Sequence, residues 1–136
     1  MTKRHDISYM AGIIDGEGCI SINYARKSGE YRMRISITNT DRILLDWVQE
    51  RYGGYIYERK KQMPHYKRKY EWCIFAHRPQ RKFIEALAET LIIKRDRALL
   101  GLEFLNLAGQ RGEEVRKKRE QIYLSISKLN SGRARD

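Results

Sequence analysis

In some segments hydrophobic residues recur every three to four positions, which is typical of a helix, and in others they alternate with polar residues, which is typical of a strand. The chain is therefore expected to alternate between helices and pairs of strands. Helical spacing of the first apolar residues predicts a helix that is capped by Ser8 and ends near 15–16. Strict alternation then predicts strands over 19–24 and from Arg32 onward, with a turn at 27–30 between them. The first part of the chain is therefore predicted to be a helix followed by a β-hairpin.

The same two periods continue to the end of the chain. Thr40 is expected to cap a second helix, which starts at Asp41 and ends at Gly53-Gly54, where glycine permits the backbone of a helix end. A second hairpin and three helices are predicted after it: strands at 55–60 and 69–77, then helices from Pro79, over 99–107 and over 113–129. The resulting α-β-β-α-β-β-α-α-α order is typical of an α+β fold with a four-stranded antiparallel sheet and helices on one face.

Length and composition favour one domain that does not enter a membrane. The 136 residues suit a single domain over 1–130, with 131–136 as a mobile basic tail. The chain has no run of about 18 apolar residues and no secretory apolar stretch at its start, so an intracellular, soluble protein without a membrane partner is predicted. Its compartment is left open. Cys19 and Cys73 lie too far apart for a CxxC zinc motif.

Alternation in the strands assigns side chains to two faces of the sheet. The face toward the helices is predicted to be apolar and to consist of Ile20, Ile22, Met33, Ile35, Ile37, Ile56, Trp72 and Ile74. The opposite face is predicted to be basic and polar, with Ser21, Asn23, Arg32, Arg34, Ser36, Tyr57, Arg59, Lys67, Lys69 and Glu71. Such a ribbon fits the major groove of DNA, where Arg can pair with guanine, Asn with adenine and Glu71 with cytosine. A merely solvated face explains the alternation equally well, and a slip of one residue would exchange the faces.

The net charge shifts the balance toward a polyanionic partner. The chain has 28 Lys and Arg against 17 Asp and Glu, a formal charge of +11. A ribosomal or simply basic protein has the same property, but several of these cations fall on the predicted polar face. Basic residues in loops are expected to contact phosphates. The DNA-binding residues predicted in this way are Ser21, Asn23, Lys27, Arg32, Arg34, Ser36, Thr38, Tyr57, Arg59, Lys61, Lys67, Lys69, Glu71 and Cys73.

One short segment carries the candidate chemistry. Residues 9–18 lead from apolar and small residues into two acids, Asp15 and Glu17, which are flanked by glycines. Residues 10–18 resemble the LAGLIDADG signature of homing endonucleases and related intron maturases. Gly16 takes the place of the alanine, and Glu17 that of the second aspartate. The order of elements also matches this family, so the resemblance extends over nearly the whole chain and implies a saddle-shaped sheet.

The resemblance implies a metal-dependent, site-specific DNA endonuclease of the intron-homing type. Such an enzyme makes a double-strand cut with short 3′ overhangs in a long, roughly palindromic target. Glu17 and the carbonyl of Gly16 match the ligands of Mg²⁺, or of another divalent cation such as Mn²⁺. Asp15 matches an acid with a mostly structural role. Lys94 matches a catalytic lysine and Asn39 a residue that orders water, with Arg42 nearby; capping of the next helix is the alternative for these last two.

A single copy of the signature supplies one acid cluster, so the resemblance implies a homodimer. The interface is expected to contain Met10, Ala11, Gly12 and Ile14 of the signature helix. The alternative is a non-cutting binder on the same scaffold, either a maturase, for which RNA is the partner, or a DNA-binding regulator. Retention of both acids favours the nuclease.

Overall fold

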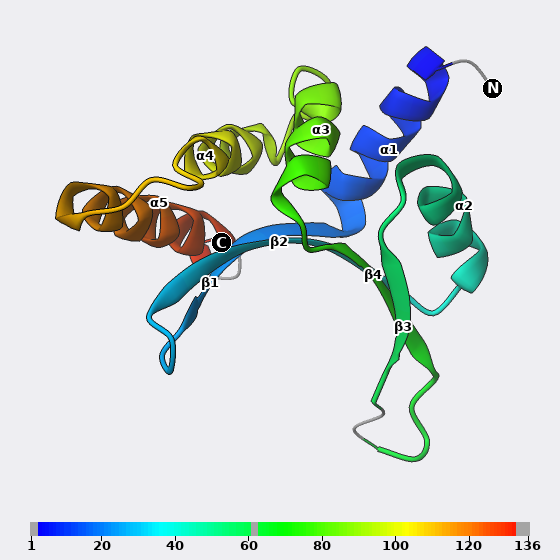
Figure 1. Cartoon of the computed structure of the whole chain (residues 1–136). Coiled ribbons are helices and arrows are strands. Elements are labelled where there is room, and N and C mark those ends of the chain that lie inside the picture. The colour runs from blue at the N-terminus through cyan, green and yellow to red at the C-terminus, as the bar shows by residue number, and fades with distance from the viewer. Residues whose placement is uncertain (1–2, 61–62, 133–136) are drawn as a thin grey trace.

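The computed structural model of the chain describes residues 3–60 and 63–132 and consists of one sheet with helices on one side (Figure 1). Its elements in chain order are α1 (Lys3–Glu17), β1 (Gly18–Ala25), β2 (Glu30–Asn39), α2 (Arg42–Tyr52), β3 (Tyr55–Arg59), β4 (Lys69–Ile74), α3 (His77–Leu87), α4 (Arg95–Asn106) and α5 (Glu113–Gly132). The strands are antiparallel neighbours in the order β1-β2-β4-β3. The predicted fold class and element order are confirmed.

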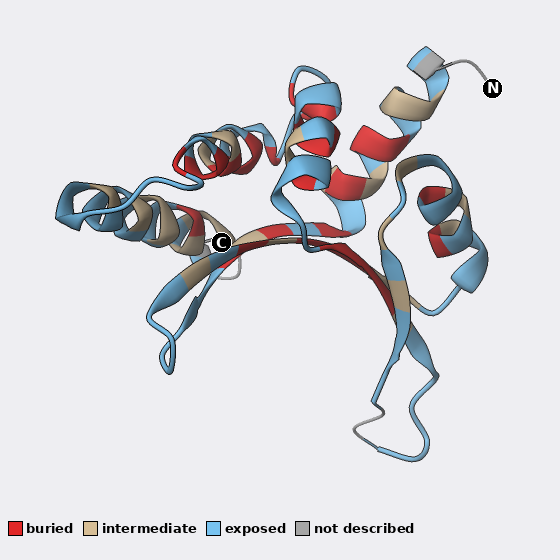
Figure 2. Ribbon diagram, viewed as in Figure 1, coloured by how far each residue is buried: buried red, intermediate tan, exposed pale blue. Residues whose placement is uncertain are grey.

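The sheet is arched, and its two hairpins extend away from the helices at its two ends (Figure 1). In the β1–β2 ladder Ile20 lies opposite Ile35 and Ile22 opposite Met33, and these side chains point toward the helices. All the residues predicted for this face are buried except Ile56, which is half-buried against the same core. Figure 2 shows the buried residues gathered between sheet and helices. Because neighbouring residues of a strand point to opposite faces, the polar set lies on the open, concave side.

The predicted starts of α1, α2 and α4 differ from the observed ones, and α4 begins at Arg95 where residue 99 was expected. α1 begins at Lys3, so Ser8 lies inside the helix and does not cap it. The helix extends back because Ile7 packs against the core and stabilises the added turn. α2 is capped by Asp41 and not by Thr40, since the Asp41 carboxylate accepts a backbone N–H of the first turn at 2.9 Å.

Two predicted boundaries also change. Lys67 lies in the loop before β4, so it is not a residue of the sheet face. β4 ends at Ile74, whereas the predicted strand extended to residue 77. α5 runs to Gly132, where a mobile tail from residue 131 was expected; residues 133–136 lie outside the described residues. The last turns of α5 are held by Arg97 of α4, whose guanidinium donates to the carbonyl of residue 129 at 2.9 Å. Over 3–60 and 63–132, no helix is long and apolar enough to cross a membrane.

Candidate active site

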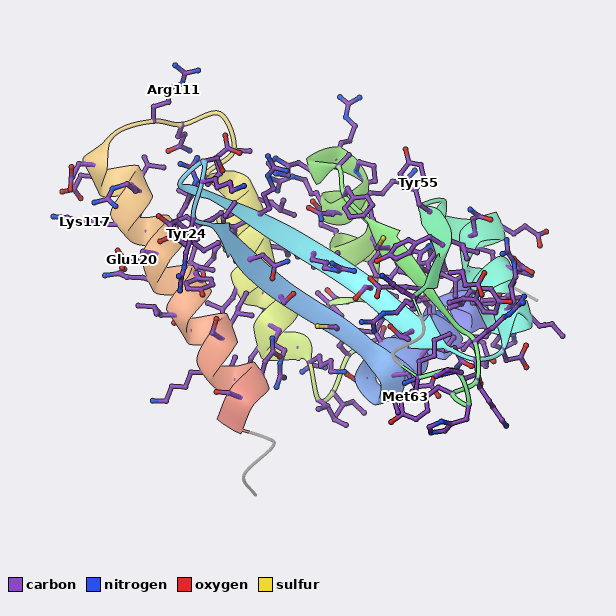
Figure 3. The ribbon with its side chains drawn as sticks, turned by 90° about the horizontal axis from the view of Figure 1, so that it is seen from below. Tyr24, Tyr55, Met63, Arg111, Lys117 and Glu120 are labelled. Atoms are coloured by element: carbon purple, nitrogen blue, oxygen red, sulfur yellow. The ribbon has the colours of Figure 1, made fainter. Side chains whose placement is uncertain are left out.

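The concave face of the sheet carries polar and basic side chains from all four strands. In the β1–β2 ladder Ser21 lies opposite Arg34 and Asn23 opposite Arg32. Arg59 lies opposite Lys69 where β3 pairs with β4. Figure 3 looks onto this face from below and shows side chains standing along the strands. The structure thus places the predicted strand residues on one surface, while Lys27 lies in the β1–β2 turn and Lys61 lies outside the described residues.

Glu71 lies on this face but is buried, with 5% of its side chain exposed. Its carboxylate accepts the Tyr57 hydroxyl hydrogen at 2.6 Å and forms an ion pair with Arg34, which donates to the Tyr57 oxygen at 2.7 Å. Arg59 lies 3.7 Å from the same carboxylate and Thr38 lies 3.5 Å from it. Glu71 is therefore engaged within the sheet, and not open to a cytosine amino group as predicted. It fixes the orientation of Arg34 and Tyr57.

Two further residues predicted to touch DNA have little surface of their own. Cys73 is 0% exposed and Ser36 is 8% exposed, and the two lie opposite each other where β2 pairs with β4. Burial raises the pKa of the Cys73 thiol. The predicted direct contact by Cys73 is therefore not available in this arrangement. Cys19 is exposed opposite Ser36, and the alternation that turned Ile20 inward could have identified it.

Glu17 is the last residue of α1, and its carboxylate is exposed. It accepts a hydrogen bond from the Asn39 amide nitrogen at 2.8 Å, while the Asn39 oxygen accepts the N–H of Asp41 at 2.8 Å. One side chain at the end of β2 thus orients the acid and also fixes the turn into α2. Arg42 pairs with Asp46 at 3.3 Å, so its guanidinium is turned along α2.

Asp15 does not point toward the concave face. Its carboxylate accepts the backbone N–H of Ile92 at 2.8 Å and that of Lys94 at 2.9 Å. Burial alone would raise the pKa of Asp15, but backbone hydrogen bonds from Ile92, Lys94 and Ile93 and the charge of Lys94 lower it below the ordinary 3.8. The carboxylate thus holds the turn before α4 against the end of α1, which agrees with a structural role.

Lys94 is buried, with 7% of its surface exposed. Its ammonium donates to the carbonyl oxygen of Ile14 at 2.9 Å and to that of Gly18. The lysine therefore contacts the backbone on either side of the acids.

The predicted subunit interface has to be corrected. Met10, Ala11 and Ile14 are 0–2% exposed, because they pack into the core of their own chain. Gly12 is exposed, and apart from the nearby backbone of α1 itself no atom lies within 4 Å of where a Cβ would stand on Gly12 or Gly16. The side of α1 that remains open for another helix is therefore the one that carries these two glycines.

The residues at the end of α1 fit a hard divalent cation. They offer the exposed carboxylate of Glu17 and backbone carbonyls at the negative end of a helix, including that of Gly16. Oxygen donors of this kind are those that Mg²⁺ prefers, with water and phosphate completing its shell. Among the described residues no three His, Cys, Asp or Glu side chains gather into a metal site.

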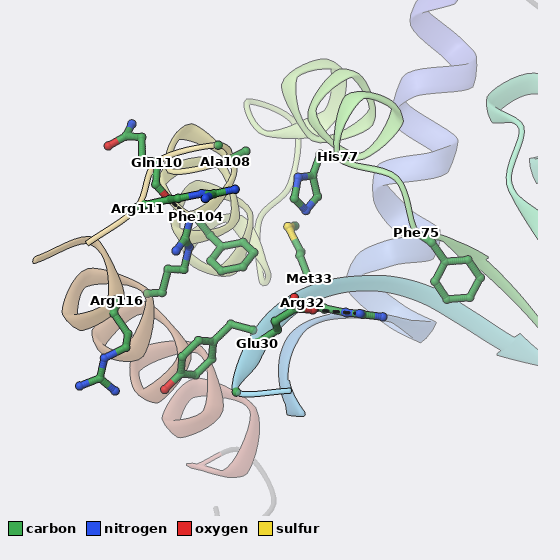
Figure 4. Close-up of a pocket in the computed structure, with 14 residues that line it drawn as sticks. Glu30, Arg32, Met33, Phe75, His77, Phe104, Ala108, Gln110, Arg111 and Arg116 are labelled. Carbon is green, nitrogen blue, oxygen red and sulfur yellow. Dashed lines mark hydrogen bonds and ion pairs between the residues drawn. The ribbon is translucent and has the colours of Figure 1, made fainter. Parts of the chain in front are cut away.

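A cavity of about 710 Å³ lies elsewhere, at the outer end of the sheet beside the α4–α5 loop (Figure 4). Phe104 and Met33 line it together with arginines, of which Arg32 is paired with Glu30 and Arg116 donates to Glu113. None of the residues at the end of α1 lines this cavity.

Comparison with known proteins points to one family. A family model described as LAGLIDADG endonuclease matches residues 10–92, more than half of the chain. Among curated proteins none matches.

Solved structures show the same fold. The homing endonuclease I-CvuI, in complex with a DNA target, superposes with a TM-score of 0.79 at 20% identity, over 93% of this chain and 82% of its own. The archaeal intron-encoded homing endonuclease I-Vdi141I, complexed with DNA, gives 0.78 at 24% identity, over 94% of this chain and 86% of its own. The match of the family model, with α1 ending in Glu17 above a concave polar sheet, shows that this chain belongs to the LAGLIDADG endonuclease family.

Proposed function

We propose that this protein is a metal-dependent, site-specific DNA endonuclease of the homing type, which cuts both strands of a long, roughly palindromic target and leaves short 3′ overhangs. The observation that carries the proposal is the exposed carboxylate of Glu17, held by Asn39 at 2.8 Å where α1 meets the polar sheet. I-CvuI, which has a similar fold, was solved with DNA targets in the presence of Mg and of Ca.

Each part of the site has a role in phosphodiester hydrolysis. Glu17 and the Gly16 carbonyl would hold Mg²⁺ or Mn²⁺, which neutralises phosphate charge and activates water when it is bound. Asn39 keeps the Glu17 carboxylate in one orientation. Arg32, Arg59 and Lys69 on the concave face offset the charge of the DNA backbone and supply affinity.

We further propose that the active form is a homodimer. One chain contributes a single exposed signature acid, whereas cutting both strands requires an acid at each scissile phosphate. The open side of α1 permits a second α1 to approach closely, because Gly12 and Gly16 present no side chain there. A two-fold axis between the helices would match a palindromic target.

The test is a library of duplex DNA targets incubated with the protein in Mg²⁺ and in EDTA. Cutting of both strands is expected only in Mg²⁺. Glu17→Gln is expected to bind the selected target within a few-fold of wild type in EDTA and to cut it roughly 10³-fold more slowly, since a metal ligand is lost. Glu103→Gln makes the same change at an exposed residue of α4 and serves as the control.

Specific binding without any metal-dependent cut would contradict the nuclease proposal and indicate a non-cutting nucleic-acid binder. Unchanged cutting by Glu17→Gln would remove Glu17 from its role.

A further inference from the structure

The outer part of the β1–β2 hairpin has a neighbouring strand on one side only. β1 pairs with residues 30–37 of β2, whereas β4 pairs with residues 35–39. Where β2 and β4 separate, the buried side-chain amide of Gln80 donates to the carbonyl of Met33 at 2.7 Å. Within the described part of the chain, residues 30–34 of β2 therefore have no strand on their second edge.

The cavity of about 710 Å³ lies along this second edge. Residues 29–33 line it from the hairpin, and residues 108–111 line it from the α4–α5 loop (Figure 4). A cavity gives few packing contacts, so it leaves this side of the hairpin without support. Because a two-stranded hairpin is only marginally stable by itself, its outer part depends on what packs against its faces.

α5 packs against the outer hairpin through three tyrosines. Tyr24 and Tyr31 lie opposite each other near the end of the β1–β2 ladder, with ring centroids 4.7 Å apart. The Tyr123 ring of α5 lies 5.3 Å from that of Tyr31 and 6.5 Å from that of Tyr24. Figure 3 shows Tyr24 beside α5. We call these three residues the tyrosine cluster, and tilted ring pairs of this kind attract each other beyond the effect of burial alone.

α5 is itself fixed to the sheet at a place further from the end of the hairpin. Ile126 is fully buried in the core, and the side-chain amide of Asn130 donates to the carbonyl of Ile20 at 3.1 Å. α5 thus follows β1 from Ile20 near the start of the strand to Tyr24 near its end. A helix anchored at one end can therefore hold the hairpin at one angle through the other.

The tyrosine cluster lies behind two of the residues proposed to meet DNA. Asn23 precedes Tyr24, Arg32 follows Tyr31, and Asn23 and Arg32 lie opposite each other in the ladder. Because neighbouring residues of a strand point to opposite faces, Asn23 and Arg32 stand on the concave side while the tyrosines face α5. Base recognition requires side chains to be held within about 0.5 Å of the right position, so a shift of the hairpin would misplace both.

We propose that Tyr123 is a positioning residue for base recognition: through the tyrosine cluster it fixes the angle at which Asn23 and Arg32 meet the bases, and it does not itself touch DNA. This inference rests on the proposed binding of DNA by the concave face. The ring contacts of Tyr123 support it, together with the cavity on the second edge of the hairpin.

Base discrimination measured without cutting tests this role. The full chain is bound in EDTA to duplexes that each change one base pair, symmetrically in both halves of a target selected from the DNA library by binding. Asn23→Ala and Arg32→Ala identify the positions that the hairpin reads, since loss of a base contact relaxes selectivity there. Tyr123→Ala and Tyr123→Phe are then compared with two controls, Leu124→Ala at an exposed site of α5 and Tyr52→Ala at a half-buried ring of α2.

Tyr123→Ala is expected to lose about 10-fold of the discrimination at the positions read by Asn23 and Arg32, and to change by less than about 3-fold elsewhere. Amides of residues 22–33 are expected to exchange their hydrogens faster, because the outer hairpin opens more readily. Tyr123→Phe keeps the ring and is expected to discriminate like the wild type. Both controls are expected to keep wild-type discrimination at the hairpin positions.

An unchanged profile in Tyr123→Ala, an equal loss at every position, or the same local loss in Tyr52→Ala would overturn the proposal. If Tyr123→Ala does not fold, Tyr24→Ala decides by the same criteria, since Tyr24 is the 43% exposed member of the cluster. A wild type that selects a target but never cuts it would refute the nuclease proposal and leave this one standing. A wild type that binds every duplex equally would overturn both.

Discussion

Asp15 reaches a turn that lies 77 residues further along the chain at Ile92 and holds it through two backbone N–H groups. Its neighbour Glu17 accepts one amide hydrogen from Asn39 and is exposed. Only Gly16 separates the two acids, yet the Asp15 carboxylate binds backbone N–H groups and the Glu17 carboxylate faces solvent. Residues two positions apart point to nearly opposite sides of a helix with 3.6 residues per turn, so these two carboxylates can take separate roles.

Asp15→Asn is expected to lower the unfolding free energy by about 1–2 kcal/mol at pH 7, because a charged acceptor of two backbone hydrogen bonds is lost. The pKa of Asp15 is lower in the folded chain than its ordinary 3.8, so its contribution is complete above that pH and is lost as the pH falls through the folded pKa. Urea unfolding at a series of pH values should therefore show the difference from wild type shrinking below about pH 3.8. A difference that does not shrink as the pH falls below that value would contradict this, and Asp46→Asn in α2 is the control.

At the scale of elements, the sheet is cross-linked on its concave side by one carboxylate. Glu71 of β4 joins Arg34 of β2 and Tyr57 of β3. β4 lies between β2 and β3, and the strand pairing that joins the two hairpins is that of β2 with β4. The Glu71 contacts therefore fix the relative position of the hairpins on the side proposed to meet DNA.

Glu71→Gln is expected to lower the unfolding free energy by about 1–2 kcal/mol, because it leaves the Arg34 charge, which is only one-third exposed, without its partner. Glu58→Gln breaks the Glu58–Arg68 pair, in which both side chains are about half exposed or more, and is expected to cost at most about 0.5 kcal/mol. Urea unfolding of the two variants gives the comparison. Equal losses of unfolding free energy in the two variants would show that burial of Glu71 does not increase its contribution to stability.

At the scale of the whole molecule, one chain presents an arched sheet and, in its signature segment, the exposed acid Glu17. Tyr9, which is 51% exposed, lies on α1 three residues before Gly12. Together with the open glycines it gives α1 a narrow surface on which a second helix can pack, since small residues allow close approach of backbones. Under the homodimer proposal this surface brings two copies of Glu17 to the centre of one DNA site.

Gly12→Arg is expected to leave the fold of one chain intact, since apart from the nearby backbone of α1 itself no atom lies within 4 Å of a Cβ at this position. It should weaken dimerisation by about 100-fold or more, because a charged side chain would be buried without a partner between the helices. Sedimentation velocity with and without target DNA measures this. Gln121→Arg on α5 is the control, and an unchanged dimer in Gly12→Arg would place the subunit interface elsewhere.

Much of the fold could be predicted because helices and strands each have a characteristic spacing of hydrophobic residues that can be recognised within a short segment. The alternation in β1, β2 and β4 specified which residues face the helices, since a strand turns neighbouring side chains to opposite sides. The signature segment, residues 10–18, indicated Glu17 as the candidate metal ligand and indicated the LAGLIDADG family. Helix starts were less predictable, as at Lys3, because packing of Ile7 against the core extends α1 beyond any capping signal.

The sequence by itself thus determined the element order, the two faces of the sheet and the identity of the exposed acid, because each depends on residues close together in the chain. Only the tertiary structure decided that Met10, Ala11 and Ile14 belong to the chain's own core, and that Asp15 and Lys94 join the end of α1 to the turn before α4. Contacts between residues about eighty positions apart arise from how helices pack on the sheet. No local pattern of residues encodes that packing.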